Sequence, residues 1–157
     1  MKRVTIHTDG ACKGNPGRGA WAAVLVCPPH RLELSAAYQA TTNNRMELRA
    51  AIHSLEKLTE PCAVELYSDS QYLVKALNER WLDGWRRRGW KTADKKPVKN
   101  RDLWERLAKA ADPHQIRIHW VKGHAGDSGN ERCDELANLA VANGPLLEDD
   151  GFESRTA

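Results

Sequence analysis

Residues 3–10 read Arg-Val-Thr-Ile-His-Thr-Asp-Gly, and this stretch indicates how the chain begins to fold. Apolar and polar side chains alternate from Arg3 to Thr8, which is the period of two that is typical of a β-strand with one buried face. Gly10 opens a stretch rich in glycine and proline, so we expect the strand to end at Asp9. A carboxylate therefore follows directly after a buried strand.

Segments of the same kind predict four further strands, at residues 20–27, 31–40, 63–68 and 116–121. The first three strands follow one another without a helix between them, so we expect an antiparallel meander. Apolar residues at helical spacing predict helices between residue 44 and Pro61 and at residues 70–78, 101–111 and 130–143. The expected fold class is α/β, a five-stranded mixed sheet with its first three strands antiparallel, flanked by helices.

Length and composition are those of one globular domain. The chain has 157 residues, of which 41% are hydrophobic and 29% are charged, and these values exclude a disordered chain and a small disulfide scaffold. We expect a single domain over residues 1–143 and a flexible C-terminal tail over residues 144–157, where the sequence is polar. No apolar run approaches the roughly 20 residues of a membrane span, so no membrane partner is expected.

The N-terminus and the cysteines predict a cytoplasmic protein. The chain reaches Asp9 before any apolar stretch long enough for a signal peptide. Its four cysteines are Cys12, Cys27, Cys62 and Cys133. They form no CxxC pair and no zinc-binding pattern, so we interpret them as reduced thiols, although their even number leaves a disulfide open.

Basic residues concentrate in one segment, residues 80–101. It holds nine lysines and arginines against two aspartates, a net charge of +7 in a chain whose total is +3. Three of the six tryptophans also lie there, namely Trp81, Trp85 and Trp90. Cations neutralise phosphates and flat rings stack on sugars or bases, so this pattern favours nucleic-acid binding. The alternative is a charged surface helix whose tryptophans anchor it to the core.

Four acidic residues are placed so that they can converge, namely Asp9, Glu47, Asp69 and Asp134. Asp9 and Asp69 follow predicted strands, and mixed α/β sheets carry their sites at the carboxyl ends of strands. The other two lie near the starts of predicted helices. Carboxylates without basic partners repel one another unless divalent cations neutralise them, and ligation by oxygen alone favours Mg²⁺ or Mn²⁺ over zinc.

Each of these acids also has an ordinary structural interpretation. Glu47 fits a capping box with Asn44, and Asp69 can be the N-cap of a helix. Asp9 can be a turn residue, and Asp134 can lie on a solvated helix face. The pattern alone does not select these four from the 21 acidic residues of the chain.

Six motifs occur in order along the chain. They are Thr8-Asp9-Gly10, Gly14-Asn15-Pro16-Gly17, Thr42-Asn43-Asn44-Arg45-Met46-Glu47, Ser68-Asp69-Ser70-Gln71-Tyr72, Gly123-His124-Ala125-Gly126 and Asn130-Glu131-Arg132-Cys133-Asp134-Glu135-Leu136-Ala137. Through these motifs the chain resembles type 1 ribonuclease H of the bacterial kind, from about Arg3 to Ala142. The segment from Trp81 to Trp90 also resembles the substrate-binding protrusion of that family, the basic handle. We use the name handle for residues 80–101.

The resemblance implies an endonuclease that hydrolyses the RNA strand of RNA–DNA hybrids and leaves 3′-hydroxyl and 5′-phosphate ends. It implies two Mg²⁺ ions per site, with Mn²⁺ as a substitute. Asp9 would contact both ions, and Asp69 the ion that activates water. Glu47 and Asp134 would hold the ion near the leaving group. His124 is implied as a proton shuttle, because histidine titrates near neutral pH, and a monomer is implied as the working state.

The resemblance also implies which residues contact the hybrid. The 2′-hydroxyl groups would be read by Asn15, Asn44 and Gln71, with the backbone near Cys12 and Glu47. Thr42 and Asn43 would lie close to phosphates. The handle would contact the DNA strand through Trp81, Trp85, Arg86, Arg87, Arg88 and Trp90. Ordinary turn and cap roles are the alternative for the asparagines.

Two other functions stay open at this point. One is a nuclease of the same fold that acts on DNA, and the Thr42–Glu47 motif and the handle count against it. The other is a hybrid-binding module without catalysis. The complete set of four acids and His124 counts against the module, because a silent protein has no reason to keep an uncompensated acidic cluster.

Overall fold

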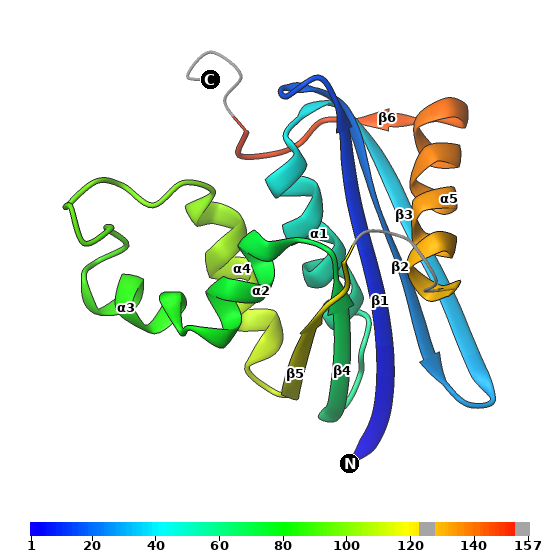
Figure 1. Cartoon of the computed structure of the whole chain (residues 1–157), viewed down its shortest axis with the longest axis horizontal. Coiled ribbons are helices and arrows are strands. Elements are labelled where there is room, and N and C mark those ends of the chain that lie inside the picture. The colour runs from blue at the N-terminus through cyan, green and yellow to red at the C-terminus, as the bar shows by residue number, and fades with distance from the viewer. Residues whose placement is uncertain (123–127, 153–157) are drawn as a thin grey trace.

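A mixed β-sheet forms the centre of the molecule (Figure 1). The computed structural model describes residues 1–122 and 128–152. The strands are β1 (Lys2–Lys13), β2 (Gly17–Cys27), β3 (His30–Thr41), β4 (Cys62–Ser68), β5 (Gln115–Trp120) and β6 (Leu146–Leu147), in the spatial order β5-β4-β1-β2-β3-β6. β1, β2 and β3 pair antiparallel, whereas β4 pairs in parallel with β1 and β5 pairs in parallel with β4. The predicted fold class and the antiparallel meander are confirmed.

The sheet has six strands, not the predicted five. β6 is two residues long and pairs in parallel with Ala37 and Tyr38 of β3. Two residues are too few to show an alternating pattern, so the sequence carries no signal for this strand. β6 also fastens the start of the expected tail to the edge of the sheet.

Helices cover both faces of the sheet. They are α1 (Asn43–Glu56), α2 (Gln71–Asn78), α3 (Trp81–Arg87), α4 (Arg101–Ala111) and α5 (Ser128–Asn143). α1 packs on β1 and β2 and against α4, whereas α5 packs on β1, β2 and β3 from the opposite side (Figure 1). The alternation of β2 explains both contacts. Trp21 and Ala23 face the core beneath α1, while Ala22 and Val24 face a smaller core beneath α5.

β1 extends beyond the residue at which we expected it to end. It continues to Lys13, and Asp9 lies inside it opposite Ala22 of β2. The parallel pairing between β1 and β4, however, stops at His7 and Tyr67. Asp9 is therefore mid-strand with respect to β2 but lies just past the end of the pairing with β4.

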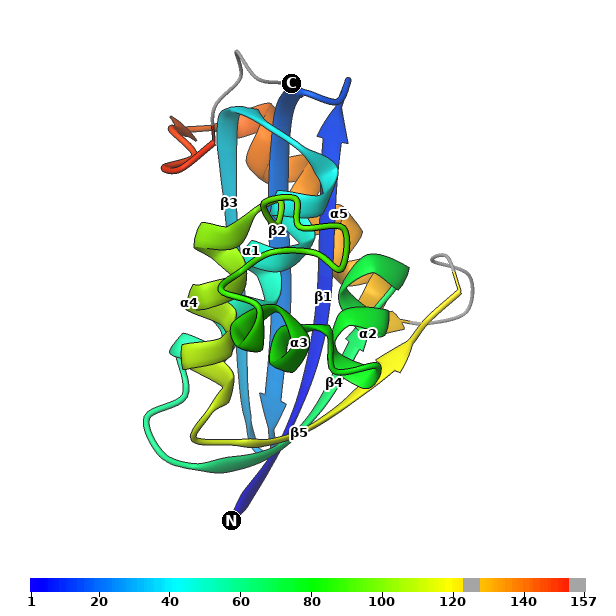
Figure 2. The ribbon, with the colours of Figure 1, turned by 90° about the vertical axis from the view of Figure 1, so that its left-hand side faces the viewer.

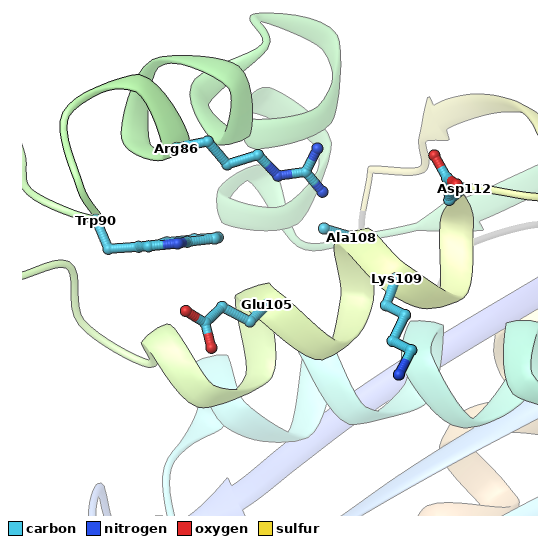
Figure 3. Close-up of a pocket in the computed structure, with 6 residues that line it drawn as sticks. All are labelled: Arg86, Trp90, Glu105, Ala108, Lys109 and Asp112. Atoms are coloured by element: carbon cyan, nitrogen blue, oxygen red, sulfur yellow. The ribbon is translucent and has the colours of Figure 1, made fainter.

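The handle (residues 80–101) projects from the side of the sheet, and α3 faces the viewer in Figure 2. Aromatic packing anchors it, because the ring of Trp85 lies edge-on to the ring of Trp104 in α4, with centroids 5.3 Å apart. Trp104 itself is fully buried. Figure 3 shows Arg86 and Trp90 on the side of the handle that faces α4, where they line a shallow groove.

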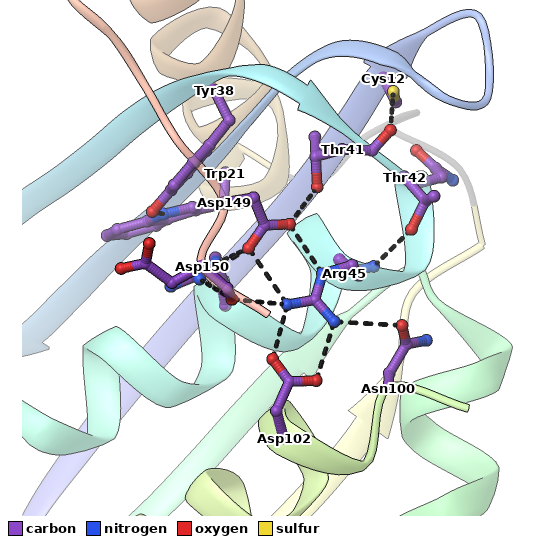
Figure 4. A network of polar contacts seen from close by, with 12 residues as sticks. Cys12, Trp21, Tyr38, Thr41, Thr42, Arg45, Asn100, Asp102, Asp149 and Asp150 are labelled. Carbon is purple, nitrogen blue, oxygen red and sulfur yellow. Dashed lines mark hydrogen bonds and ion pairs between the residues drawn. The ribbon is translucent and has the colours of Figure 1, made fainter. Parts of the chain in front are cut away.

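A buried network of charged side chains holds the C-terminal segment (Figure 4). The carboxylate of Asp149 accepts hydrogen bonds from Arg45 Nε at 2.7 Å, from Arg49 Nη2 at 2.6 Å and from the Thr41 hydroxyl at 2.6 Å. Burial acts to raise the pKa of this carboxyl, but the hydrogen bonds outweigh it, so the pKa lies below its usual value. Within the expected tail, residues 146–150 contact β3 and α1 through β6 and this network.

The same guanidinium reaches a third segment of the chain. Both Nη atoms of Arg45 donate to the carboxylate of Asp102 in α4, at 2.9 and 2.7 Å, and Nη1 also donates to Asn100. Nη2 donates to the backbone carbonyl of Asp150 as well. Arg45 thus joins the start of α1, the end of the handle and the C-terminal segment.

Two further findings concern the cysteines and the helices. All four cysteines are free thiols in the structure. Within residues 1–122 and 128–152, no helix is both long and apolar enough to cross a membrane.

The network predicts that the last described residues contribute strongly to stability. Asp149→Ala would leave two buried guanidinium groups without their shared partner, so we expect the free energy of unfolding to fall by about 3 kcal/mol. Asp150→Ala is the matched control, because that side chain is exposed and only its backbone carbonyl joins the network. The control should change stability by less than about 0.5 kcal/mol. Urea denaturation of both variants measures this, and equal changes would contradict the assignment.

Candidate active site

Three carboxylates from separate elements meet at one end of the sheet. Asp9 comes from β1, Glu47 from near the start of α1, and Asp69 from the junction between β4 and α2. One oxygen atom of each lies within 4.8 Å of the other two. Asp9 and Glu47 are 2% and 4% exposed, and Asp69 is half-buried. The result is an acidic cluster that is mostly shielded from water.

Gly10 allows α1 to approach β1 closely enough to build this cluster. A Cβ atom on Gly10 would lie 2.5 Å from the backbone nitrogen of Glu47 and 2.6 Å from the carbonyl carbon of Met46. Any side chain at this position would therefore push the start of α1 away from the strand. The lack of a side chain at Gly10 thus allows Glu47 to lie close to Asp9.

Two neighbouring segments hold the backbone of Asp69. The indole N–H of Trp120, at the end of β5, donates to the backbone carbonyl of Asp69 at 3.2 Å. On the other side, the backbone N–H of Ser70 donates to the hydroxyl of Ser68 at 3.0 Å. Asp69 is therefore fixed between β4 and α2.

Asp134 of α5 joins the cluster from the opposite helix layer. Its carboxyl group lies close enough to Asp9 to share a hydrogen bond with it. The structure thus brings together all four acids that the sequence singled out. The predicted proton shuttle, His124, lies outside the described residues.

Burial and acidic neighbours both act on Asp9 and Glu47. Burial raises the pKa of Asp9 to about 8, and the charges of Asp69 and Asp134 add to the rise. Burial and the charges of Asp69 and Asp9 likewise raise the pKa of Glu47 well above its usual value. The neighbouring carboxyls disfavour the ionised forms of Asp9 and Glu47, so the site is poised to accept positive charge.

Divalent cations fit this arrangement. Asp9 Oδ2 and Glu47 Oε1 are buried and have no hydrogen-bond partner among the described residues. Buried polar atoms are almost always partnered, so two orphaned oxygens in one acidic cluster indicate a group that binds there. Hard oxygen donors alone suit Mg²⁺ and Mn²⁺.

These acids do not act as helix caps. The N-cap of α1 is Thr42, whose hydroxyl accepts a hydrogen bond from the backbone N–H of Arg45 at 3.3 Å. The N-cap of α2 is Ser70, whose hydroxyl accepts from the third residue of that helix at 3.2 Å. The capping-box interpretation of Glu47 and the N-cap interpretation of Asp69 are wrong.

The residues expected to contact a hybrid lie in segments around the cluster. Asn15 lies in the turn between β1 and β2, where its Oδ1 accepts from the backbone N–H of Asn43 at 3.0 Å. Gln71 begins α2 and is exposed. The thiol of Cys12 donates to the carbonyl of Thr41 at 3.3 Å, so only its backbone is positioned for the predicted contact.

A groove of about 680 Å³ lies between the start of α1 and the end of the handle. Its lining includes Asn15, Thr42, Asn44, Lys99, Asn100 and Arg101. The groove combines amide and hydroxyl groups from the start of α1 with basic groups from the end of the handle. Such a lining suits a phosphate backbone.

The handle packs against α4 and also exposes basic side chains. The predicted anchoring role is found for Trp85, which packs on Trp104, and Trp81 lies 6.0 Å from Trp85 between ring centroids. Arg86 and Arg87 are exposed, as is Arg88, although Arg88 Nε donates to the carbonyl of Lys91 within the handle. The three indoles are half-buried, so each keeps part of its ring accessible.

Sequence reasoning missed the residues that hold this region together. Arg45 lies inside the Thr42–Glu47 motif, yet the motif says nothing of its partners. Asn100, Asp102 and Asp149 lie 55 to 104 residues further along the chain. The sequence carries no signal for this role, because α1 also holds Arg49 and Glu56 and only the structure shows that Arg45 is buried.

Comparisons with known proteins agree with this site. The family model described as RNase H matches residues 1–142. The chain is 57% identical over 152 residues to a ribonuclease H of Nitratidesulfovibrio vulgaris (strain DSM 19637 / Miyazaki F), covering 97% of each chain. It is 60% identical over 142 residues to a ribonuclease H of Cupriavidus metallidurans, covering 90% of this chain and 97% of the relative.

A solved structure gives the same relationship at greater distance. The crystal structure of LC9-RNase H1, a type 1 RNase H with the type 2 active-site motif, superposes with a TM-score of 0.81 at 30% identity. The match covers 100% of this chain and 82% of that one. Sequence, fold and the position of the acidic cluster lead to one assignment: this chain belongs to the ribonuclease H family.

Proposed function

We propose that the protein is a metal-dependent endonuclease that hydrolyses the RNA strand of RNA–DNA hybrids. The observation that carries the proposal is the largely buried cluster of Asp9, Glu47 and Asp69, two of whose oxygens have no hydrogen-bond partner in the described part of the chain. The products are RNA ends with a 3′-hydroxyl and a 5′-phosphate. We also propose that the protein acts as a monomer in the cytoplasm.

The cluster would hold two Mg²⁺ ions, with Mn²⁺ as a substitute. Asp9 would contact both, Asp69 the ion on the side of the attacking water, and Glu47 and Asp134 the ion on the side of the leaving group. Bound metal ions supply a water of lowered pKa and neutralise charge on the phosphate and on the departing oxygen. The elevated pKa values of Asp9 and Glu47 support this assignment, because they reflect buried carboxyls that lie close to other carboxyls.

The chain's own residues would select and orient the RNA strand. Asn15, Asn44 and Gln71 would do this with their side-chain amides, because amides both donate to and accept from a 2′-hydroxyl. Thr42 and Asn43 would lie near phosphates, where the start of α1 favours negative charge. His124 would transfer a proton to the leaving oxygen or assist product release.

Two alternatives are weighed against specific observations. A binding module without catalysis gains nothing from Asp9 Oδ2 and Glu47 Oε1, which raise the cost of folding and bind no phosphate. A DNA nuclease has no need for the amide groups beside the acids. The test incubates the protein with an RNA–DNA hybrid, a DNA duplex and an RNA duplex, with Mg²⁺ and again with a chelator. We expect cleavage of the hybrid alone, in its RNA strand, and only with metal.

One prediction from the proposed function concerns Asp9→Asn, which keeps the shape of the side chain and removes its charge. Hydrolysis should fall by about 10³-fold or more, because bound metal ions contribute several kcal/mol to such reactions. Hybrid binding should persist. Without metal, the free energy of unfolding should rise by about 1–3 kcal/mol, because one of the repelling buried carboxyls is gone.

Single-turnover kinetics, a binding assay and urea denaturation measure these three effects. Asp112→Asn is the matched control, because it makes the same chemical change at an exposed residue that ends α4. The control should leave all three quantities unchanged. Substantial Mg²⁺-dependent activity in Asp9→Asn would falsify the assignment of Asp9 as the shared ligand.

The second prediction concerns the exposed charge of the handle. Replacing Arg86, Arg87 and Arg88 with alanine removes cations without touching the acidic cluster, so hybrid binding should weaken while turnover at saturating hybrid changes little. Each phosphate contact contributes about 0.9 to the slope of log affinity against log salt on B-form DNA. The slope should therefore flatten by roughly 2 to 3 units.

A second triple variant separates local contacts from net charge. Lys2, Arg3 and Arg117 are exposed basic residues outside the handle, in β1 and β5. Replacing them with alanine removes the same charge and should leave the salt slope nearly unchanged. Equal slopes for the two triple variants would mean that the handle arginines are only a solvated face.

A further inference from the structure

The start of α5 rests on the ring of His7 in β1. Gly129 is the second residue of α5, and a Cβ atom there would overlap the His7 ring, with only 2.6 Å to Nδ1. Contacts this short do not occur between real atoms, so the helix start and the ring already touch. Gly129 is therefore as close to β1 as this ring permits.

The ring has little freedom to move aside. It stacks on the ring of Tyr67 in β4, with centroids 4.8 Å apart and planes 12° apart. Tyr67 stacks in turn on His119 in β5, at 4.9 Å and 26°. Nε2 of His119 lies 3.1 Å from Oε1 of Glu65. Three rings across three strands thus form a support beneath the start of α5.

A second contact fixes the next turn of the same helix. Cys133 lies four residues after Gly129, so both face β1. Its thiol donates to the backbone carbonyl of His7 at 3.2 Å, and its side chain is fully buried. The next residue is Asp134. His7 and Asp9 are two residues apart on one strand and so lie on the same face of the sheet, the face that α5 covers.

We propose that His7 is a positioning residue for Asp134. Its ring, pressed against Gly129, sets the distance between the start of α5 and β1, and so sets where the Asp134 carboxyl meets Asp9. The proposal rests on the proposed function in one respect, since it takes Asp134 as a ligand of the metal site. The proposal assigns this role to the shape of the ring, which contacts Gly129 and stacks on Tyr67.

Helix propensity alone predicts the opposite effect of a substitution at Gly129, so the experiment can distinguish the two explanations. Alanine forms helices better than glycine, so Gly129→Ala should stabilise α5 if nothing but helix formation constrains this position. If the His7 ring limits the approach, the added methyl group must lift the start of the helix and displace Asp134.

The experiment measures Mg²⁺ binding without a hybrid, as the rise in Tm during a Mg²⁺ titration, alongside kcat and KM for an RNA–DNA hybrid. In Gly129→Ala we expect the half-saturating Mg²⁺ concentration to rise about tenfold, the scale on which residues that orient metal ligands act. At fixed Mg²⁺, kcat should fall while KM stays within about twofold. Ser128→Ala, an exposed neighbour in the same helix turn, is the matched control and should behave as the parent protein.

Two variants of His7 complete the design. His7→Phe keeps a flat ring in the same place, so it should keep the parent Mg²⁺ dependence. His7→Ala removes the support and should weaken Mg²⁺ binding, but in the Gly129→Ala background it makes room for the methyl group and should restore part of the lost affinity. If Gly129→Ala does not fold, the pair His7→Phe and His7→Ala carries the test.

The outcomes separate the inference from the proposed function. Parent-like Mg²⁺ dependence in both Gly129→Ala and His7→Ala overturns the positioning role, while cleavage by the parent protein leaves the function standing. Weakened Mg²⁺ binding in His7→Phe also overturns it, because the ring would then act through its nitrogens. A parent protein that binds Mg²⁺ but cleaves no hybrid refutes the proposed function, and the Mg²⁺ titrations still decide the positioning role.

Discussion

The arrangement of this protein depends on the hydrogen bonds and ion pairs of the Arg45 guanidinium. It is 2% exposed, and its donors reach Asp149, Asp102 and Asn100, from two segments that lie 55 to 104 residues away in the sequence. A buried charge of this kind must be paired, because the cost of leaving it unpaired exceeds the stability of many domains. The position of α1, and with it Glu47, is thereby linked to the end of the handle and to the C-terminal segment.

Two buried aspartates in this fold have opposite surroundings. Asp149 receives hydrogen bonds from two arginines and a hydroxyl, and the pKa of its carboxyl lies below the usual value. Asp9 is equally buried, has acidic neighbours, and has its pKa raised to about 8. The fold supplies arginine partners to Asp149, but among residues 1–122 and 128–152 no arginine is paired with Asp9, which indicates that this site is kept for a ligand. That contrast is a stronger argument for a metal site than acidity alone.

The sequence predicted most of the fold and the four acids, but for different reasons. The alternation of β1 to β3 and the helical spacing of α1 are local signals, and the structure confirms the elements they predict. The acids emerged only from the resemblance, since each also fitted a cap or a turn. Local sequence patterns did not predict β6 or the role of Asp149, because the partners of both lie about 100 residues away in the sequence. They also placed Asp9 at the end of β1, whereas the strand continues beyond it. There the strand continues because β2 pairs with it after β4 no longer does.

The handle shows why side-chain type alone does not separate binding from anchoring. Trp85 packs against the buried Trp104, so the aromatic residues of the segment fasten it to α4 and cannot all be stacking platforms. This anchoring would also serve the proposed binding role, because it holds the exposed arginines of α3 next to α4. Since Arg45 ties α4 and Asn100 to the start of α1, the basic surface and the acidic cluster belong to one rigid arrangement. A duplex that contacts both must then match their fixed separation, so the geometry of the duplex, and not only its charge, becomes part of recognition.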